Sequence, residues 1–243
     1  MTDCTVIIPI GPGHMELAKV AMGSVVAAID ADKGGFDQIY VVVGDDTKGE
    51  IGRSAARNRM VARQEDWMGV FGEEADPAAA FETEWLFFLD ADDLMCSPKV
   101  YGESAFAVAT PYLADYDCIW GTIHELNAEG LMFKRNQVDR ITTYEAYVKK
   151  PAPLTCQMGH FIRRAAFNEI GGFDEALDVC EDVDLYLREW KTLRCIKQET
   201  PLFLNRRGAH SWQQKTDSER PRPTGRDWSL RAEEMLKAAR KEL

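Results

Sequence analysis

The sequence has no long apolar segment, and it does not begin with a basic and apolar leader. A helix that crosses a membrane needs about 18 or more consecutive apolar residues, and none of the apolar runs approaches that length. We therefore expect a soluble protein without a membrane span or a secretion signal.

Paired cysteine motifs are also missing. None of the six cysteines belongs to a C-x-x-C pair. This spacing argues against a zinc knuckle and favours reduced, mostly buried thiols, which are typical of a reducing compartment. We therefore expect a cytoplasmic protein. The cysteines are Cys4, Cys96, Cys118, Cys156, Cys180 and Cys195.

Positive charge is scarce, with 29 lysines and arginines against 40 acidic residues and a formal net charge of -11. This balance weighs against non-specific binding of nucleic acid. Cationic residues concentrate late in the chain, where they either hold a phosphate-rich partner or lie in solvent. That group comprises Arg206, Arg207, Lys215, Arg220, Arg222 and Arg226.

Three short apolar runs indicate strands that are covered on both faces. They occupy residues 5–10, 39–43 and 85–89 of the 243-residue chain, and each is too short for a buried helix. Helical patterns follow them, at about residues 14–29, 52–62 and 98–113. This alternation predicts an α/β protein with a parallel sheet.

The alternation weakens in the second half of the chain. Residues 118–126 and 131–138 predict a hairpin, and Gly171 and Gly172 end a short helix. Late strands are expected at 194–198 and 201–204, and an amphipathic helix at 229–243. We therefore expect a mixed, partly antiparallel extension of the sheet.

Acidic residues follow two of the predicted strands. Asp45 and Asp46 come after the second strand, and Asp90, Asp92 and Asp93 come after the third. Because the carboxyl ends of parallel strands share one edge of a sheet, these acids suggest a common cleft. Three neighbouring carboxylates repel one another, so a divalent cation is expected among them. The alternative is that they cap a helix that begins near Ser97.

Three further features stand beside this edge. Arg53 and Arg57 lie near the start of the second helix, where the helix dipole disfavours cations unless an anion or solvent offsets it. Glu181 and Asp182 open a later helix, either as caps or as a general base facing the cleft. His210 is either a metal or phosphate contact or a histidine without a special role.

Four segments in this order resemble the inverting glycosyltransferases of family 2. They are Val-Ile-Ile-Pro-Ile at 6–10, Ala-Arg-Asn at 56–58, Phe-Leu-Asp-Ala-Asp-Asp at 88–93, and Ile-Gly-Gly-Phe-Asp-Glu at 170–175 with Glu181-Asp182. The resemblance implies the Rossmann-like GT-A fold, a mixed and mainly parallel sheet flanked by helices. It also implies one domain at 1–205, with a nucleotide-binding half at 1–95 and an acceptor-side half at 96–205. A C-terminal loop and helix at 206–243 follow.

The resemblance also implies a role for each matched residue. Asp45 or Asp46 holds the nucleobase, usually uracil, while Arg57 contacts the nucleotide or its diphosphate and Asp90 contacts the ribose. Asp92 binds Mn²⁺ or Mg²⁺, and Asp182 deprotonates the acceptor hydroxyl with Glu181 beside it. Further implied contacts are Pro9, Ile10 and Ala91 to the nucleotide and His210 to the metal or diphosphate.

The implied activity is metal-dependent, inverting transfer of a sugar from a nucleotide-diphosphate sugar, with a UDP-sugar as the expected donor. A nucleotidyltransferase is an alternative, but no glycine-rich, lysine-bearing loop follows the first strand. A non-catalytic sugar-nucleotide-binding protein is another, although it would not need both Asp92 and Asp182. The acceptor stays open among a glycan, a lipid-linked glycan, a protein, a small molecule and a modified nucleobase, as do the donor sugar and the oligomeric state.

Overall fold

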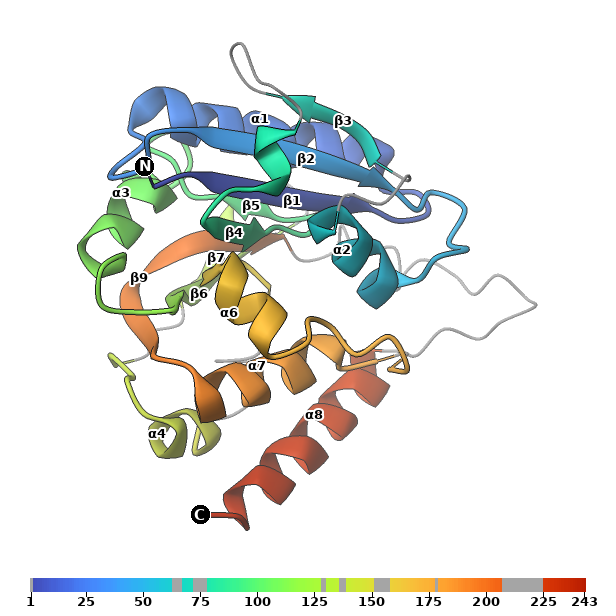
Figure 1. Ribbon diagram of the computed structural model, residues 1–243, viewed down its shortest axis with the longest axis vertical. Coiled ribbons are helices and arrows are strands. Elements are labelled where there is room, and N and C mark those ends of the chain that lie inside the picture. The colour runs from blue at the N-terminus through green and yellow to red at the C-terminus, as the bar shows by residue number, and fades with distance from the viewer. Residues whose placement is uncertain are drawn as a thin grey trace.

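The computed structural model (Figure 1) describes most of the chain. The described residues are 2–62, 67–71, 78–127, 130–135, 139–150, 158–177, 179–206 and 225–243. The strands are β1 (Cys4–Ile10), β2 (Ile39–Asp45), β3 (Trp67–Phe71), β4 (Trp85–Phe88), β5 (Leu94–Met95), β6 (Cys118–Leu126), β7 (Met132–Arg135), β8 (His160–Arg163) and β9 (Cys195–Arg206). The helices are α1 (Met15–Ala31), α2 (Arg53–Val61), α3 (Ala105–Ala109), α4 (Tyr144–Val148), α6 (Arg164–Glu169), α7 (Glu181–Thr192) and α8 (Gly225–Arg240), with 3₁₀ turns η1 (Ala79–Phe81) and η2 (Thr110–Tyr112).

The strands form one mixed sheet in the order β3-β2-β1-β4-β8-β6-β9-β5, and β7 pairs with β6. β1 is parallel to both β2 and β4, and β6 is parallel to β9. The remaining pairs are antiparallel. This arrangement confirms the predicted mixed α/β sheet with an antiparallel contribution from the second half of the chain.

Strand β1 explains why its sequence is apolar at almost every position. Val6 and Ile8 point into a core shared with α1, whereas Ile7, on the opposite face, belongs to a core shared with α2, α6 and α7. Successive side chains of a strand point to opposite faces, so a strand that is covered on both sides needs apolar residues throughout. Figure 1 shows α1 on one side of the sheet and α2, α6 and α7 on the other.

The parallel strands end together at one edge of the sheet. Ile10 at the end of β1 pairs with Asp45 at the end of β2, and Leu89, just after β4, donates its backbone N–H to the carbonyl of Ile7. The acids at the end of β2 and just after β4 therefore lie at the same edge, on the right-hand side of Figure 1. This is the side on which α/β sheets bind ligands.

Two expected elements differ from the structure. The helix expected at 98–113 is a turn that passes through Gly102, at φ 93°, followed by α3 and η2. Helix α3 begins only after Ser104, whose hydroxyl accepts a hydrogen bond from the N–H of Phe106. The two strands expected at 194–198 and 201–204 are one strand, β9, with its irregular pairing to β6 near Pro201.

None of the helices in the described residues is long and apolar enough to cross a membrane. The described cysteines agree with the expectation of buried thiols. All five are buried and unbridged, and Cys156 lies outside the described residues.

Candidate active site

The acids that follow β4 form a close cluster. One carboxylate oxygen from each of Asp90, Asp92 and Asp93 lies within 4.8 Å of the others. Asp92 and Asp93 are buried, whereas the side chain of Asp90 is 33% exposed. No helix begins at Ser97, where the chain turns, so these acids do not cap one there.

The cluster fits a divalent cation. Mn²⁺ and Mg²⁺ bind carboxylate oxygens, and three of them converge here within the described part of the chain. Burial raises the pKa of Asp93 well above its usual value, and the charges of Asp92 and Asp90 raise it further. A cation among the three carboxylates would offset this repulsion.

Strand β9 supports the cluster from the other end of the sequence. The Asp93 carboxylate accepts hydrogen bonds from the side-chain amide of Asn205 and from the backbone N–H of Arg206, each at 3.1 Å. The Arg206 Nε donates to the carbonyl oxygen of Asp92 at 2.9 Å, and its Nη2 is buried without a partner among the described residues. Arg206 therefore brings a positive charge to the edge of the cluster.

Arg57 joins this cluster to the acids of α7. Its Nη2 donates to Asp90 at 2.6 Å, and its Nη1 donates to Glu181 at 3.1 Å. The guanidinium is 6% exposed and lies 5.2 Å from the ring centre of Phe173. Burial by itself lowers the pKa of Arg57, but Asp90 and Glu181 raise it more, so the net shift is upward. The two carboxylates also offset the unfavourable interaction of this cation with the dipole at the start of α2.

The Ala-Arg-Asn and Gly-Gly-Phe-Asp-Glu segments also meet in space. Asn58 donates to the Phe173 carbonyl and to Glu175, both at 2.9 Å, and accepts from the Phe173 N–H at 3.0 Å. Gly172 has φ 67°, and a Cβ there would lie 2.8 Å from the Asn58 side-chain oxygen. These residues fix α2 against the segment before α7, which holds Arg57 opposite Glu181.

Asp182 has a different environment from its neighbour Glu181. Its Oδ1 accepts hydrogen bonds from the N–H of Val183 at 2.9 Å and from the indole Nε1 of Trp228 at 3.2 Å. Burial and the charge of Glu181 raise the pKa of Asp182 to about 7, although both hydrogen bonds act in the opposite direction. A carboxyl group that titrates near neutral pH is suited to accept a proton.

The two acids at the end of β2 have different environments. Asp46 is buried, and its two carboxylate oxygens accept from the N–H groups of Ile51 and Gly52 at 3.0 and 3.1 Å. Asp45 is exposed, and its Oδ1 accepts from the N–H of Thr47 at 2.8 Å. Hydrogen bonds from the side chain and the backbone N–H of Thr47 lower the pKa of Asp45, with a smaller contribution from Lys48. Asp46 organises the loop, whereas Asp45 faces solvent beside the ends of β1 and β2.

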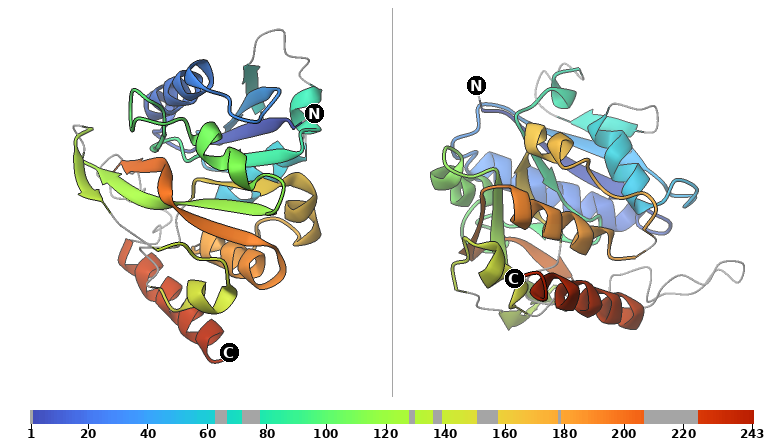
Figure 2. Two further views of the ribbon diagram at one scale, coloured as in Figure 1. Left: turned by 90° about the vertical axis from the view of Figure 1, so that its left-hand side faces the viewer. Right: turned by 60° about the horizontal axis from the view of Figure 1, so that its bottom comes forward.

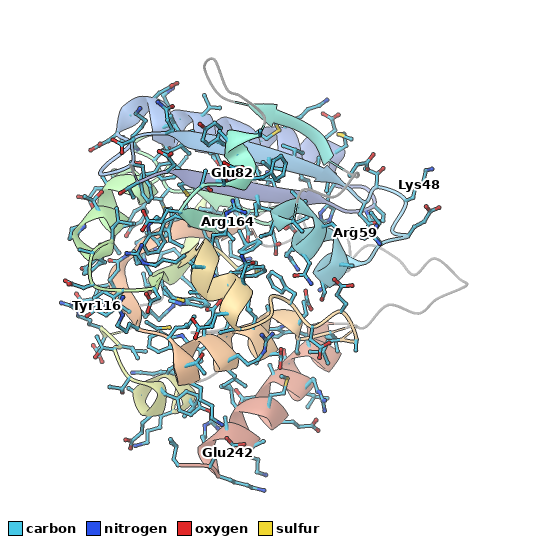
Figure 3. The ribbon with its side chains drawn as sticks, in the orientation of Figure 1. Lys48, Arg59, Glu82, Tyr116, Arg164 and Glu242 are labelled. Carbon is cyan, nitrogen blue, oxygen red and sulfur yellow. The ribbon has the colours of Figure 1, made fainter. Side chains whose placement is uncertain are left out.

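Other expected contacts lie at the same edge or outside the described residues. Pro9 and Ile10 end β1, and Ala91 is buried between Asp90 and Asp92. Figure 3 shows Lys48, from the loop after β2, and Arg59, from α2, on the side where β1 and β2 end. His210 lies outside the described residues.

Two residues of the site carry no local signal in the sequence. In the sequence, Arg206 is one member of a basic stretch, and no motif predicts a role for Trp228. They are 114 and 46 positions away from their partners Asp92 and Asp182. Only the pairing of β9 and the packing of α8 bring them to the site.

No model of a protein family matches the sequence, and no curated protein does either. Solved structures of TarS from S. aureus are similar in fold, each at 16% identity. For TarS 1–349 in complex with UDP-GlcNAc, the TM-score is 0.57, with 98% of this chain and 66% of that chain covered. For the structures titled TarS and TarS 1–349, the scores are 0.55 and 0.54, each with 85% of this chain covered, and with 37% and 60% of those chains covered.

This likeness shows the fold, which is the GT-A-like α/β arrangement that the sequence predicts. The chain spans between about a third and two thirds of the length of these TarS structures.

Proposed function

We propose that the protein is an inverting glycosyltransferase that moves a sugar from a nucleotide-diphosphate sugar, with a UDP-sugar as the expected donor, to an acceptor hydroxyl. The observation that carries this proposal is the Arg57 bridge. One side of its guanidinium contacts the carboxylate cluster, which fits a metal ion. The other side contacts the acid pair, in which Asp182 has a pKa of about 7. A fold neighbour in complex with UDP-GlcNAc supports the choice of donor.

The donor is assigned to the carboxyl edge of β1, β2 and β4. Asp45 is the better candidate for the nucleobase, because Asp46 already has both carboxylate oxygens bonded to its own loop. Asp90 faces the ribose, and Asp92 binds Mn²⁺ or Mg²⁺ with the other two acids in reach. When bound, the metal ion offsets the negative charge that develops on the departing diphosphate. Arg57 and Arg206 add positive charge at this edge.

Asp182 is the proposed general base. The acceptor hydroxyl gives its proton to the carboxylate as its oxygen forms a bond to the anomeric carbon of the sugar. The bond from that carbon to the diphosphate oxygen breaks, and the nucleoside diphosphate leaves. In-line displacement inverts the anomeric configuration. Glu181 is paired with Arg57, so Asp182 is the member of the pair that takes the proton.

The remaining assignments rest on the resemblance to family 2. Under this proposal residues 1–205 form the glycosyltransferase domain, and His210 helps to hold the metal or the diphosphate. Pro9, Ile10 and Ala91 contact the nucleotide through the backbone. The protein is expected in the cytoplasm, and the acceptor is one of the hydroxyl-bearing classes named above.

Release of UDP from a panel of UDP-sugars, with Mn²⁺ and with water or added glycans as acceptors, tests this function. NMR of the product then shows the anomeric configuration at the transferred carbon. We expect UDP release from one sugar and a product of inverted configuration. Retention of configuration would contradict the single displacement, and release of pyrophosphate from a nucleoside triphosphate would favour a nucleotidyltransferase.

A further inference from the structure

Trp228 makes two contacts to the segment that carries the proposed base. Its indole Nε1 donates to Asp182 Oδ1 at 3.2 Å, and its backbone carbonyl accepts from the Cys180 thiol at 3.3 Å. Trp228 belongs to the first turn of α8, whereas Cys180 and Asp182 are at the start of α7. The two helices therefore meet at the acid pair.

The backbone at this point is in an uncommon conformation. Cys180 has φ 63°, and it is the only non-glycine residue with positive φ among the described residues. A side chain disfavours this conformation, and such residues persist where the surrounding structure holds them. Cys180 precedes Glu181 and Asp182 directly, so the contact with the Trp228 carbonyl helps to fix the direction of both acids.

Helix α8 is anchored well away from Trp228. Ala232, Leu236 and Ala239 are buried in the core shared with α7. Figure 2 shows α8, in red, from two further sides. At its far end Lys191 pairs with Glu242 at 2.8 Å, with Glu242 labelled in Figure 3, and Arg240 donates to the Val148 carbonyl at 2.5 Å. Packing along the whole helix therefore sets the place of the indole.

We propose that Trp228 is a positioning residue for Asp182 and that α8 completes the active site. The proposal rests on the proposed function, in which Asp182 is the general base. An indole N–H only donates, so it fixes the Oδ1 atom and favours the ionised carboxylate. Both described hydrogen bonds of this side chain go to Oδ1, and Oδ2 is the atom that takes the acceptor proton.

Among the described residues, three charged or titratable groups act on Asp182. Glu181 and Tyr186 come from α7, and Arg57 comes from α2. Helix α8 contributes the neutral indole of Trp228. Replacing the indole with phenyl thus removes one donor and leaves Glu181, Tyr186 and Arg57 unchanged.

The Trp228→Phe variant tests the proposal in the absence of any substrate. The titration of Asp182 is followed by NMR of carboxyl groups in protein labelled with ¹³C at aspartate, with Asp182→Asn used for assignment. We expect the midpoint to rise from about 7 by about one pH unit, the shift expected when a carboxylate loses a hydrogen bond. The matched control is Trp190→Phe, because the Trp190 indole N–H is buried on α7 without a partner among the described residues.

An unchanged midpoint in Trp228→Phe, or an equal shift in Trp190→Phe, would overturn the proposal. If Trp228→Phe does not fold, the indole N–H resonance of Trp228 in the unmutated protein decides instead. It should move with pH at the midpoint of Asp182, and a resonance that does not move would overturn the proposal. Failure of the proposed function is seen separately, because the unmutated protein would then release no UDP from the UDP-sugars, or Asp182→Asn would release it as fast.

Discussion

The two acidic groups of the site differ in what surrounds them. After β4, three carboxylates converge within 4.8 Å, and one of them, Asp90, has a bond to Arg57. At the start of α7, Glu181 is paired with Arg57 and Asp182 with a neutral indole. The first group concentrates negative charge, which suits a cation, and the second leaves one carboxyl group that titrates near pH 7. Under the proposed function, the first group binds the metal ion and the second takes the proton.

Replacing the proposed base gives the largest expected effect. Asp182→Asn keeps the size of the side chain and still accepts from Val183 and Trp228, but it takes up no proton. We expect UDP release and transfer to fall by about 10² to 10⁴-fold, the usual scale for a general base, with UDP affinity retained. The matched control is Asp184→Asn on the same helix, whose partner is Arg188 at 2.6 Å. A rate equal to that of the control would remove Asp182 from the mechanism.

Breaking the link between the two groups is the next largest change. Arg57→Met leaves Asp90 without its cation, and it leaves Glu181, 3% exposed, with only the longer contact to Arg53. Removal of one partner from a buried pair costs about 3 to 5 kcal/mol of stability, and the exposure of Asp90 favours the lower end. Urea unfolding measures this loss. Arg53→Met is the control, because Arg53 is 44% exposed and 3.6 Å from Glu181, and it should cost less than about 1 kcal/mol. Equal losses would show that Arg57 is not a bridge.

The raised pKa of Asp182 predicts a smaller, pH-dependent effect on stability. Its pKa is about 7 in the folded protein and lower in the unfolded chain, so the folded state binds this proton more tightly. Stability due to Asp182 therefore falls as the pH rises between the two values. Asp182→Asn removes this fall, so the variant should be more stable than the unmutated protein near pH 8, with the difference vanishing near pH 4. The free energy of unfolding of both proteins is measured in urea at several pH values. A difference between them that does not change with pH would contradict the raised pKa of Asp182.

The sequence was sufficient where a feature depends on local pattern. The apolar runs of β1, β2 and β4 indicate burial on both faces, and the acids that follow them lie at the shared edge as predicted. The helix expected at 98–113 is wrong because the chain turns at Gly102, whose φ of 93° lies outside the helical range, and α3 begins only after Ser104. The two strands expected on either side of Pro201 are one strand, β9, because irregular pairing with β6 accommodates the proline.

Features that depend on long-range packing gave no signal. Trp228 and Arg206 each reach the site from the far end of the chain, and neither stands in a motif with its partner. The different environments of Asp45 and Asp46 depend on which of them the loop residues Ile51 and Gly52 contact. The sequence alone therefore does not show which of these two neighbouring aspartates is free to contact a ligand.

The most direct test of the division between the two acidic groups is calorimetric titration of UDP into the protein with Mn²⁺ and then with EDTA, repeated with Asp92→Asn and Asp182→Asn. We expect the unmutated protein and Asp182→Asn to bind UDP only with the metal ion. Asp92→Asn should lose about 10 to 100-fold in affinity, as expected for the loss of one charged ligand. Binding that is unaffected by EDTA and by Asp92→Asn would contradict a metal site at the Asp90 cluster.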